Sequence, residues 1–149
     1  MDSKGTWPFI ASLVIGLLYL SVGIISLISG IGIIPPIPFF GDIINAFMII
    51  IVGIVYLTGA KPLMKGDREA FAFAIVGSAL AAVLFILQAI VIGTNFLGWI
   101  LQLNDWIDWN PINDIVPSLW LFVIVLLTIG FLKITNRIGG QKGIFPLGE

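Results

Sequence analysis

Four long apolar stretches, separated by short segments that hold the charges, glycines and prolines, dominate the pattern of this chain. They run from about residue 7 to 30, 42 to 60, 70 to 92 and 115 to 134. At about 1.5 Å per residue, each stretch is long enough to cross roughly 30 Å of hydrocarbon as an α-helix. We therefore expect an all-α integral membrane fold: a four-transmembrane-helix bundle forming a single domain over residues 1–149, with a cytoplasmic tail over 135–149.

The composition agrees with a membrane environment. Hydrophobic residues make up 59% of the chain and charged residues 10%, whereas soluble domains carry roughly 25% charged residues. The first apolar stretch exceeds the roughly 7–15 residues of a signal-peptide core, and no A-x-A-like site follows it. We therefore expect this stretch to be retained as the first transmembrane helix.

The charged residues divide between the two ends of the predicted helices. One end carries all the basic residues, which are Lys4, Lys61, Lys65, Arg68, Lys133, Arg137 and Lys142. The segments at the other end carry acids, which are Asp42, Asp105, Asp108 and Asp114. Since basic loops stay on the cytoplasmic side, the pattern predicts a multi-pass protein of the cell membrane with both termini cytoplasmic.

Helix-breaking and capping residues predict where these helices begin and end. Gly59 and Pro62 predict the end of the second helix, and Asp67 is a candidate N-cap for the third. Pro117 fits the first turn of the fourth helix, where a missing N–H costs nothing.

The segment between the third and fourth helices predicts an interfacial amphipathic helix over 95–109. Apolar residues recur there at helical spacing with polar residues between them. The alternative is a third helix that continues without a break, but Gly93 and Gly98 favour a bend. We expect an aromatic belt and a candidate interaction surface on the outer face, formed by Trp99, Asp105, Trp106, Asp108 and Trp109, with Trp120 nearby.

The proline-rich segment 30–41 is apolar and carries no charge. We expect it either to lie at the membrane interface or on a partner, or to form a rigid turn that ties two helices together.

Three of the four helices carry small or polar residues at alternating steps of four and three. We call this set the small-residue seam: Ser12, Gly16, Tyr19, Gly23, Ser26 and Gly30 in the first helix, Gly53 and Tyr56 in the second, and Gly77, Ala81 and Gln88 in the third. Such spacing predicts close, left-handed helix crossings. The seam serves either packing within the bundle or the binding of another subunit's helix, a lipid or a quinone tail.

Cysteine and histidine are both absent. The sequence therefore lacks the thiolate and imidazole ligands of common metal and haem sites, and the commonest general base near neutral pH. The acids and amides of 105–114 do not follow the spacing of an EF-hand loop, and we interpret them as solvated. We predict no catalytic, metal-binding or cofactor-binding residues, although a lipid or quinone held by packing is compatible with the pattern.

Polar groups within the spans are few. No Asp, Glu, Lys or Arg lies near the middle of a predicted span, so ion-coupled transport by this chain alone is disfavoured. Gln88 is expected to find a hydrogen-bonding partner such as Tyr19 or Tyr56.

The leading functional hypothesis is a non-catalytic accessory subunit that stabilises a larger membrane complex. Its expected partners are membrane lipids and other membrane subunits, and the net charge of -1 gives no reason to expect nucleic acid. An alternative is a homo-oligomeric channel or transport module lined by Tyr19, Tyr56, Thr58 and Gln88. A third is a lipid-active enzyme using Asp105 and Asp108. A high isoleucine content suggests a prokaryotic source.

Overall fold

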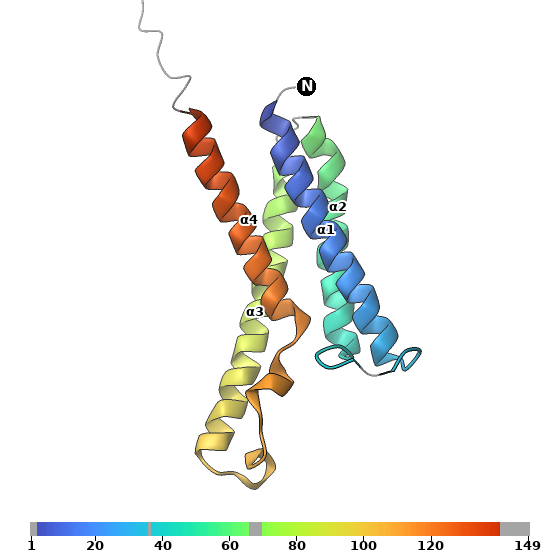
Figure 1. The fold of residues 1–149 in the computed structure, drawn as a ribbon, viewed down its shortest axis with the longest axis vertical. Coiled ribbons are helices and arrows are strands. Elements are labelled where there is room, and N and C mark those ends of the chain that lie inside the picture. The colour runs from blue at the N-terminus through green and yellow to red at the C-terminus, as the bar shows by residue number, and fades with distance from the viewer. Residues whose placement is uncertain (1–2, 36, 66–69, 141–149) are drawn as a thin grey trace, which may run out of the picture.

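The computed structural model describes residues 3–35, 37–65 and 70–140, and within these ranges every regular element is helical. The four long helices are α1 (Ser3–Gly30), α2 (Ile43–Met64), α3 (Ala70–Ile100) and α4 (Pro117–Gly140), shown in Figure 1. Two short 3-10 helices, η1 (Asn104–Trp106) and η2 (Pro111–Asp114), lie between α3 and α4. The predicted all-α, four-helix fold is confirmed.

Some sequence predictions fall outside this description. The proposed cap Asp67, the basic residue Arg68 and the tail beyond residue 140, with Lys142, lie outside the described residues. The side chains of Lys4, Asn113, Lys133 and Arg137 are likewise not described.

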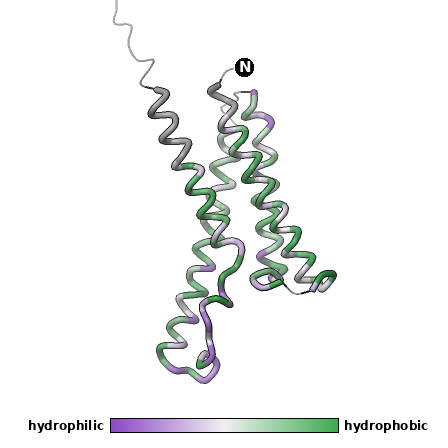
Figure 2. Tube along the Cα trace, viewed as in Figure 1, coloured by the Kyte–Doolittle hydropathy of each residue, from purple (hydrophilic) through white to green (hydrophobic). Residues whose placement is uncertain are grey.

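Three of the helices are long and apolar enough to cross a membrane, over Trp7–Gly30, Ile43–Met64 and Ala70–Ile100. In α4, which has 24 residues, the described apolar part is the shorter stretch Pro117–Gly130. Figure 2 shows apolar residues along all four helices and polar ones concentrated in the segment that joins α3 to α4. The chain is therefore an all-α integral membrane protein.

Two predicted boundaries of α2 and α4 can be compared with the structure. Pro117 begins α4, as predicted. The prediction that α2 ends between Gly59 and Pro62 was wrong, because α2 continues through Pro62 to Met64. Gly59 serves packing instead: a Cβ atom there would lie 2.5 Å from the Cβ of Phe73, so α2 and α3 meet closely only because no side chain is present.

The separate interfacial helix predicted over 95–109 is also wrong. Helix α3 does not stop at residue 92 but continues through Gly93 and Gly98 to Ile100, and the chain then forms turns and η1. With 31 residues, α3 is about 46 Å long at 1.5 Å per residue. Its second half extends past the loop that joins α1 to α2 and past the start of α4 (Figure 1).

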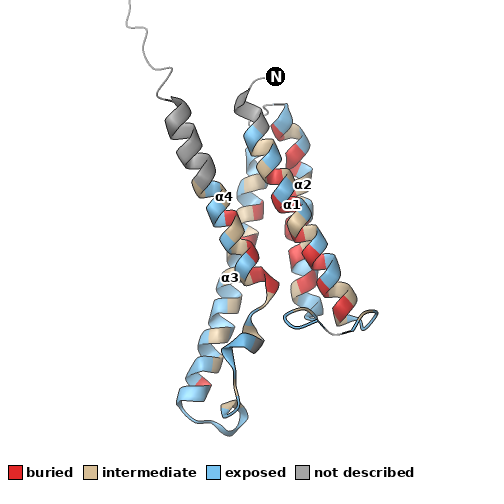
Figure 3. Ribbon diagram, viewed as in Figure 1, coloured by how far each residue is buried: buried red, intermediate tan, exposed pale blue. Residues whose placement is uncertain are grey.

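Helices α1 and α2 form a closely packed hairpin. A Cβ atom added to Gly53 of α2 would lie 2.8 Å from the backbone nitrogen of Leu20, and one added to Gly23 of α1 would lie 3.0 Å from the nitrogen of Ile50. Their buried positions form stripes along the facing sides of both helices (Figure 3). Helices α3 and α4 complete the core, whose members are Ile15, Tyr19, Val22, Ile49, Val52, Tyr56, Ala81, Leu121 and Val125.

Candidate functional site

We call the end of α3 from residue 89 and the segment 101–116 the tip; the last turns of α3 and the turns that follow extend beyond the other helices (Figure 1). Its helix ends in a Schellman arrangement, with Gln102 at a positive φ of 51°. The backbone N–H of Leu103 donates to the carbonyl of Gly98 at 3.1 Å, and that of Gln102 donates to Trp99 at 3.1 Å. These bonds satisfy the last carbonyls of α3 and turn the chain back along the helix.

Gly98 is where the returning chain meets α3. A Cβ atom at this position would lie 2.7 Å from Cδ2 of Trp106, so the indole ring lies directly on the glycine backbone. The ring nitrogen of Trp106 also donates a hydrogen bond to Oδ1 of Asn95 at 3.1 Å, one turn earlier in α3. Both contacts hold η1 against the helix.

Asp114 is the centre of a hydrogen-bond network in the tip. Its Oδ2 atom accepts bonds from Nδ2 of Asn95 at 2.7 Å and from the indole nitrogen of Trp109 at 2.8 Å. Its backbone carbonyl accepts a third bond from Nε2 of Gln88 at 3.0 Å. Gln88 has a hydrogen-bonding partner, as expected, but this partner is the Asp114 carbonyl and not Tyr19 or Tyr56. The network links α3 to the middle of the 101–116 segment at Trp109 and to its last residues at Asp114.

The outer surface of the tip is largely apolar. Phe96, Trp99 and Trp109 form an aromatic cluster, with ring centroids 6.0–6.5 Å apart. Exposed apolar side chains surround it, namely Ile90, Leu97, Ile100, Leu101, Leu103, Ile107 and Ile112. A hollow of about 610 Å³ is lined by Trp99, Ile100, Gln102 and Ile107. Figure 3 shows most of this region as exposed.

The structure gathers the predicted outer-face residues in the tip but in different environments. Trp99, Asp105 and Asp108 are exposed, whereas Trp106 and Trp109 are half-buried and hydrogen-bonded. Sequence reasoning missed Asn95, which both donates and accepts in the network. Its signal was an amide within an apolar helical stretch, a group that needs partners when removed from water.

The small-residue seam lies inside the bundle. Ser12, Gly16, Tyr19, Gly23 and Ser26 of α1 are buried, and Gly30 is half-buried. Gly53 and Tyr56 of α2 and Gly77 and Ala81 of α3 are buried as well, while Gln88 is half-buried. A Cβ atom at Gly77 would lie 2.8 Å from the Tyr56 ring. These residues are used in contacts between helices of the same chain.

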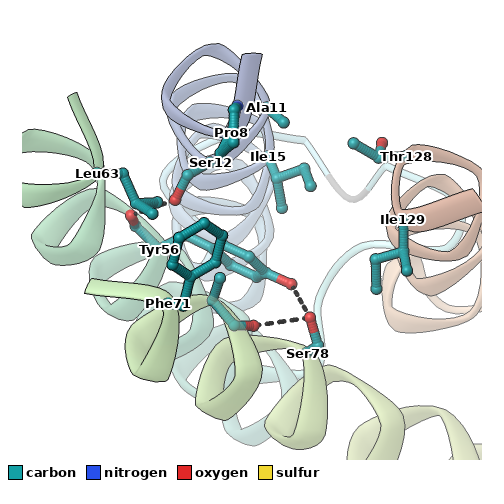
Figure 4. Close-up of a pocket in the computed structure, with 11 residues that line it drawn as sticks. Pro8, Ala11, Ser12, Ile15, Tyr56, Leu63, Phe71, Ser78, Thr128 and Ile129 are labelled. Carbon is teal, nitrogen blue, oxygen red and sulfur yellow. Dashed lines mark hydrogen bonds between the residues drawn. The ribbon is translucent and has the colours of Figure 1, made fainter. Parts of the chain in front are cut away.

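A cavity of about 100 Å³ lies between the four helices (Figure 4). Its lining combines apolar groups with four hydroxyl-bearing side chains, and consists of Pro8, Ala11, Ser12, Ile15, Tyr56, Leu63, Phe71, Ala74, Ser78, Thr128 and Ile129. The Tyr56 hydroxyl lies 2.7 Å from Oγ of Ser78, which donates to the carbonyl of Ala74 at 2.7 Å. Since Ser78 has a single proton, Tyr56 is the donor in the bond that joins them.

The four residues predicted to line a transport path do not come together. Tyr19 and Tyr56 are neighbours in the core, with ring centroids 6.3 Å apart. Thr58 is exposed on α2 and donates to the carbonyl of Ile54 in its own helix. Gln88 is engaged by Asp114 in the tip.

The described residues contain no group of three or more His, Cys, Asp or Glu side chains that could hold a metal ion. Asp105 and Asp108, the predicted pair of an outer-face enzyme, are both exposed on the turns after α3.

Comparison with known proteins places the chain in a family. The family model described as the MJ0565 integral membrane domain matches residues 5–136, which include most of α1, all of α2 and α3, and most of α4. The chain is similar to the "Uncharacterized protein MJ0565" of Methanocaldococcus jannaschii, with 29% identity over 143 residues that cover 91% of this chain and 97% of that protein. No solved structure matches the chain. The chain belongs to the MJ0565 integral membrane domain family.

Proposed function

We propose that this protein is a non-catalytic accessory subunit of the cell membrane that crosses the bilayer four times and uses its tip to bind and stabilise a larger membrane complex. The observation that carries this proposal is the length of α3. At about 46 Å it exceeds the roughly 30 Å of a hydrocarbon core. Its last turns continue beyond the other helices (Figure 1).

The tip has the properties of a preformed binding surface. The Asp114 network and the contact of Trp106 with Gly98 hold the returning segment against α3. A partner that binds a surface already fixed in this way loses less conformational freedom than one that must order a loop. The exposed Trp99 and its apolar neighbours supply the aromatic and aliphatic side chains that interface cores favour.

The proposed topology puts the tip outside the cell. Lys61 in the last turn of α2 and Lys65 after it lie at one end of the bundle, while Asp42, the N-cap of α2, lies at the other. The acids of the tip belong to the same end as Asp42. The positive-inside rule then assigns the lysine end, with the start of α1 and the end of α4, to the cytoplasm.

Site-specific photocrosslinking in the native membrane tests the proposal. A photoreactive residue replaces Ile107 of the tip, and a matched control replaces Val83 in the span of α3. The two side chains are similarly exposed, at 59% and 52%. We expect the probe at residue 107 to form a defined adduct with another polypeptide, and the probe at residue 83 to react with lipid. The accessory role would be contradicted if the probes at residues 107 and 83 both reacted with lipid alone and if the protein were extracted by mild detergent as a monomer.

A further inference from the structure

The cavity between the four helices offers hydroxyl groups at a specific depth in the membrane. Its lining begins near the lysine end of the bundle, at Pro8, Leu63 and Phe71, and continues about two turns further into the bundle, to Ile15, Tyr56 and Ser78. In Figure 4 the Tyr56 and Ser78 hydroxyls lie on one side of the cavity, opposite Thr128 and Ile129 of α4. The cavity therefore lies in the half of the bundle at the lysine end, and the Tyr56 and Ser78 hydroxyls lie within the span, each eight residues or about 12 Å along its helix from that end.

Every side-chain hydroxyl in this cavity already donates its proton within the protein. Ser12 donates to the carbonyl of Tyr56 at 2.8 Å, and Thr128 donates to the carbonyl of Ile124 at 2.8 Å. Ser78 donates to Ala74, and Tyr56 donates to Ser78. A hydroxyl oxygen has two lone pairs besides its proton. Each of these four hydroxyls can therefore accept a hydrogen bond from a ligand but has no proton left to donate.

We propose that the cavity binds the hydroxyl end of a neutral, long-chain lipid alcohol, whose O–H donates to the phenolic oxygen of Tyr56. An acceptor-only set of side chains matches a ligand that brings its own proton. It is mismatched to a ligand whose polar atoms are carbonyl oxygens, because two acceptors then face each other without a proton between them. The pattern therefore selects an alcohol and disfavours a quinone.

The size of the cavity supports the same choice. About 100 Å³ is far below the roughly 300–1,000 Å³ of sites that enclose a whole small molecule. It accommodates the end of a chain with its hydroxyl, and a quinone ring with its substituents exceeds it. Apolar residues such as Ile15, Phe71 and Ile129 supply the rest of the lining for the adjoining methylene groups.

Photoaffinity labelling of the purified protein in nanodiscs tests this assignment. Three probes of equal chain length carry the same diazirine beside the polar end and differ only in that end, which is an alcohol, its methyl ether or a methyl ketone. We expect the alcohol to label peptides containing residues 8–15 and 71–78 about fivefold more than the other two, the effect of one hydrogen bond. Equal labelling by all three probes in the unmodified protein would overturn the proposal.

Two variants test the donor and acceptor assignment itself. Ser78→Ala removes the acceptor of the Tyr56 proton, so the phenol can donate to a ligand and labelling by the ketone should rise to at least that by the alcohol. A Tyr56→Phe, Ser78→Ala double variant should lose any preference among the probes. Ser21→Ala, which removes an exposed hydroxyl bonded within α1, should keep the alcohol preference. If the double variant still prefers the alcohol, Tyr56 is not the acceptor. If a variant fails to fold, the comparison of the three probes in the unmodified protein still tests the proposal.

Discussion

Gln88 donates a hydrogen bond from Nε2 to the backbone carbonyl of Asp114 at 3.0 Å, across 26 residues of sequence. The same Asp114 accepts two more bonds through its carboxylate. The bond from Gln88 thus fixes the point at which the returning chain reaches the bundle, three residues before α4 begins at Pro117. Asp114 therefore joins α3 to the segment that leads into α4.

Replacing Asp114 with alanine should release the tip while leaving the bundle folded. The substitution removes the acceptor of Asn95 and Trp109, and hydrogen bonds to a charged acceptor contribute about 1.5–3 kcal/mol each. We expect faster proteolysis within 101–116 and a red shift of tryptophan emission, with unchanged helical circular dichroism. Asp108→Ala, which removes an exposed acid of the same segment, is the control and should leave both signals unchanged. Equal protease resistance of the two variants would show that the network does not hold the tip.

Gly53→Ala should weaken the α1–α2 hairpin. The new methyl group would lie 2.8 Å from the nitrogen of Leu20 and 3.0 Å from the carbonyl oxygen of Gly16, so the helices must separate. Overpacking of this kind costs about 1–3 kcal/mol. Gly130→Ala in α4 makes the same change where nothing lies within 4 Å. Thermal unfolding in detergent should show a lower midpoint for Gly53→Ala but not for Gly130→Ala. Equal midpoints for the two variants would refute the close approach of α1 and α2 at Gly53.

Removing the hydroxyl of each core tyrosine should have opposite effects. The Tyr19 side chain is 1% exposed, and its hydroxyl has no hydrogen-bonding partner among the described residues. Tyr19→Phe should therefore raise the free energy of unfolding by about 1 kcal/mol, since it removes an unsatisfied buried group. Tyr56→Phe loses the bond to Ser78 and should lower that free energy by a similar amount. Chemical unfolding in mixed micelles measures the free energy of unfolding of both variants. If the two substitutions change it equally and in the same direction, the two hydroxyls do not differ in their hydrogen bonding.

Cysteine labelling can test the proposed topology directly, because the chain has no cysteine of its own. Lys65→Cys and Asp108→Cys each introduce one thiol at an exposed position at opposite ends of the molecule. In intact cells, a membrane-impermeant maleimide should label the thiol at residue 108 and spare the one at residue 65. Opening the cells should expose both. The reverse pattern would invert the topology.

Hydrophobic length and small-residue spacing predicted much of the fold. The spacing of Ser12, Gly16 and Gly23 indicated helix contact because small side chains let two backbones approach closely, and α1 and α2 pack along these positions. The start of α4 was predictable from Pro117, whose fixed φ and missing N–H suit a first turn.

The tip was not predictable because its determinants are contacts distant in sequence. Gly98 suggested a bend, but it remains helical and provides space for Trp106. The helix ends instead at Ile100, and the residue that adopts the positive φ after it is Gln102, which the sequence does not mark as a glycine would. The partner of Gln88 is a backbone carbonyl, and every residue has one, so the sequence could not single out Asp114.

The excess length of α3 makes the tip sensitive to the bilayer in which the protein sits. A hydrophobic helix longer than the local hydrocarbon is accommodated by tilting or by thickening the bilayer around it. A thicker membrane would cover the exposed apolar side chains of Ile90 and Leu97 with lipid, whereas a thinner one would leave them in water. The area of the tip that lies in water therefore depends on the thickness of the surrounding membrane.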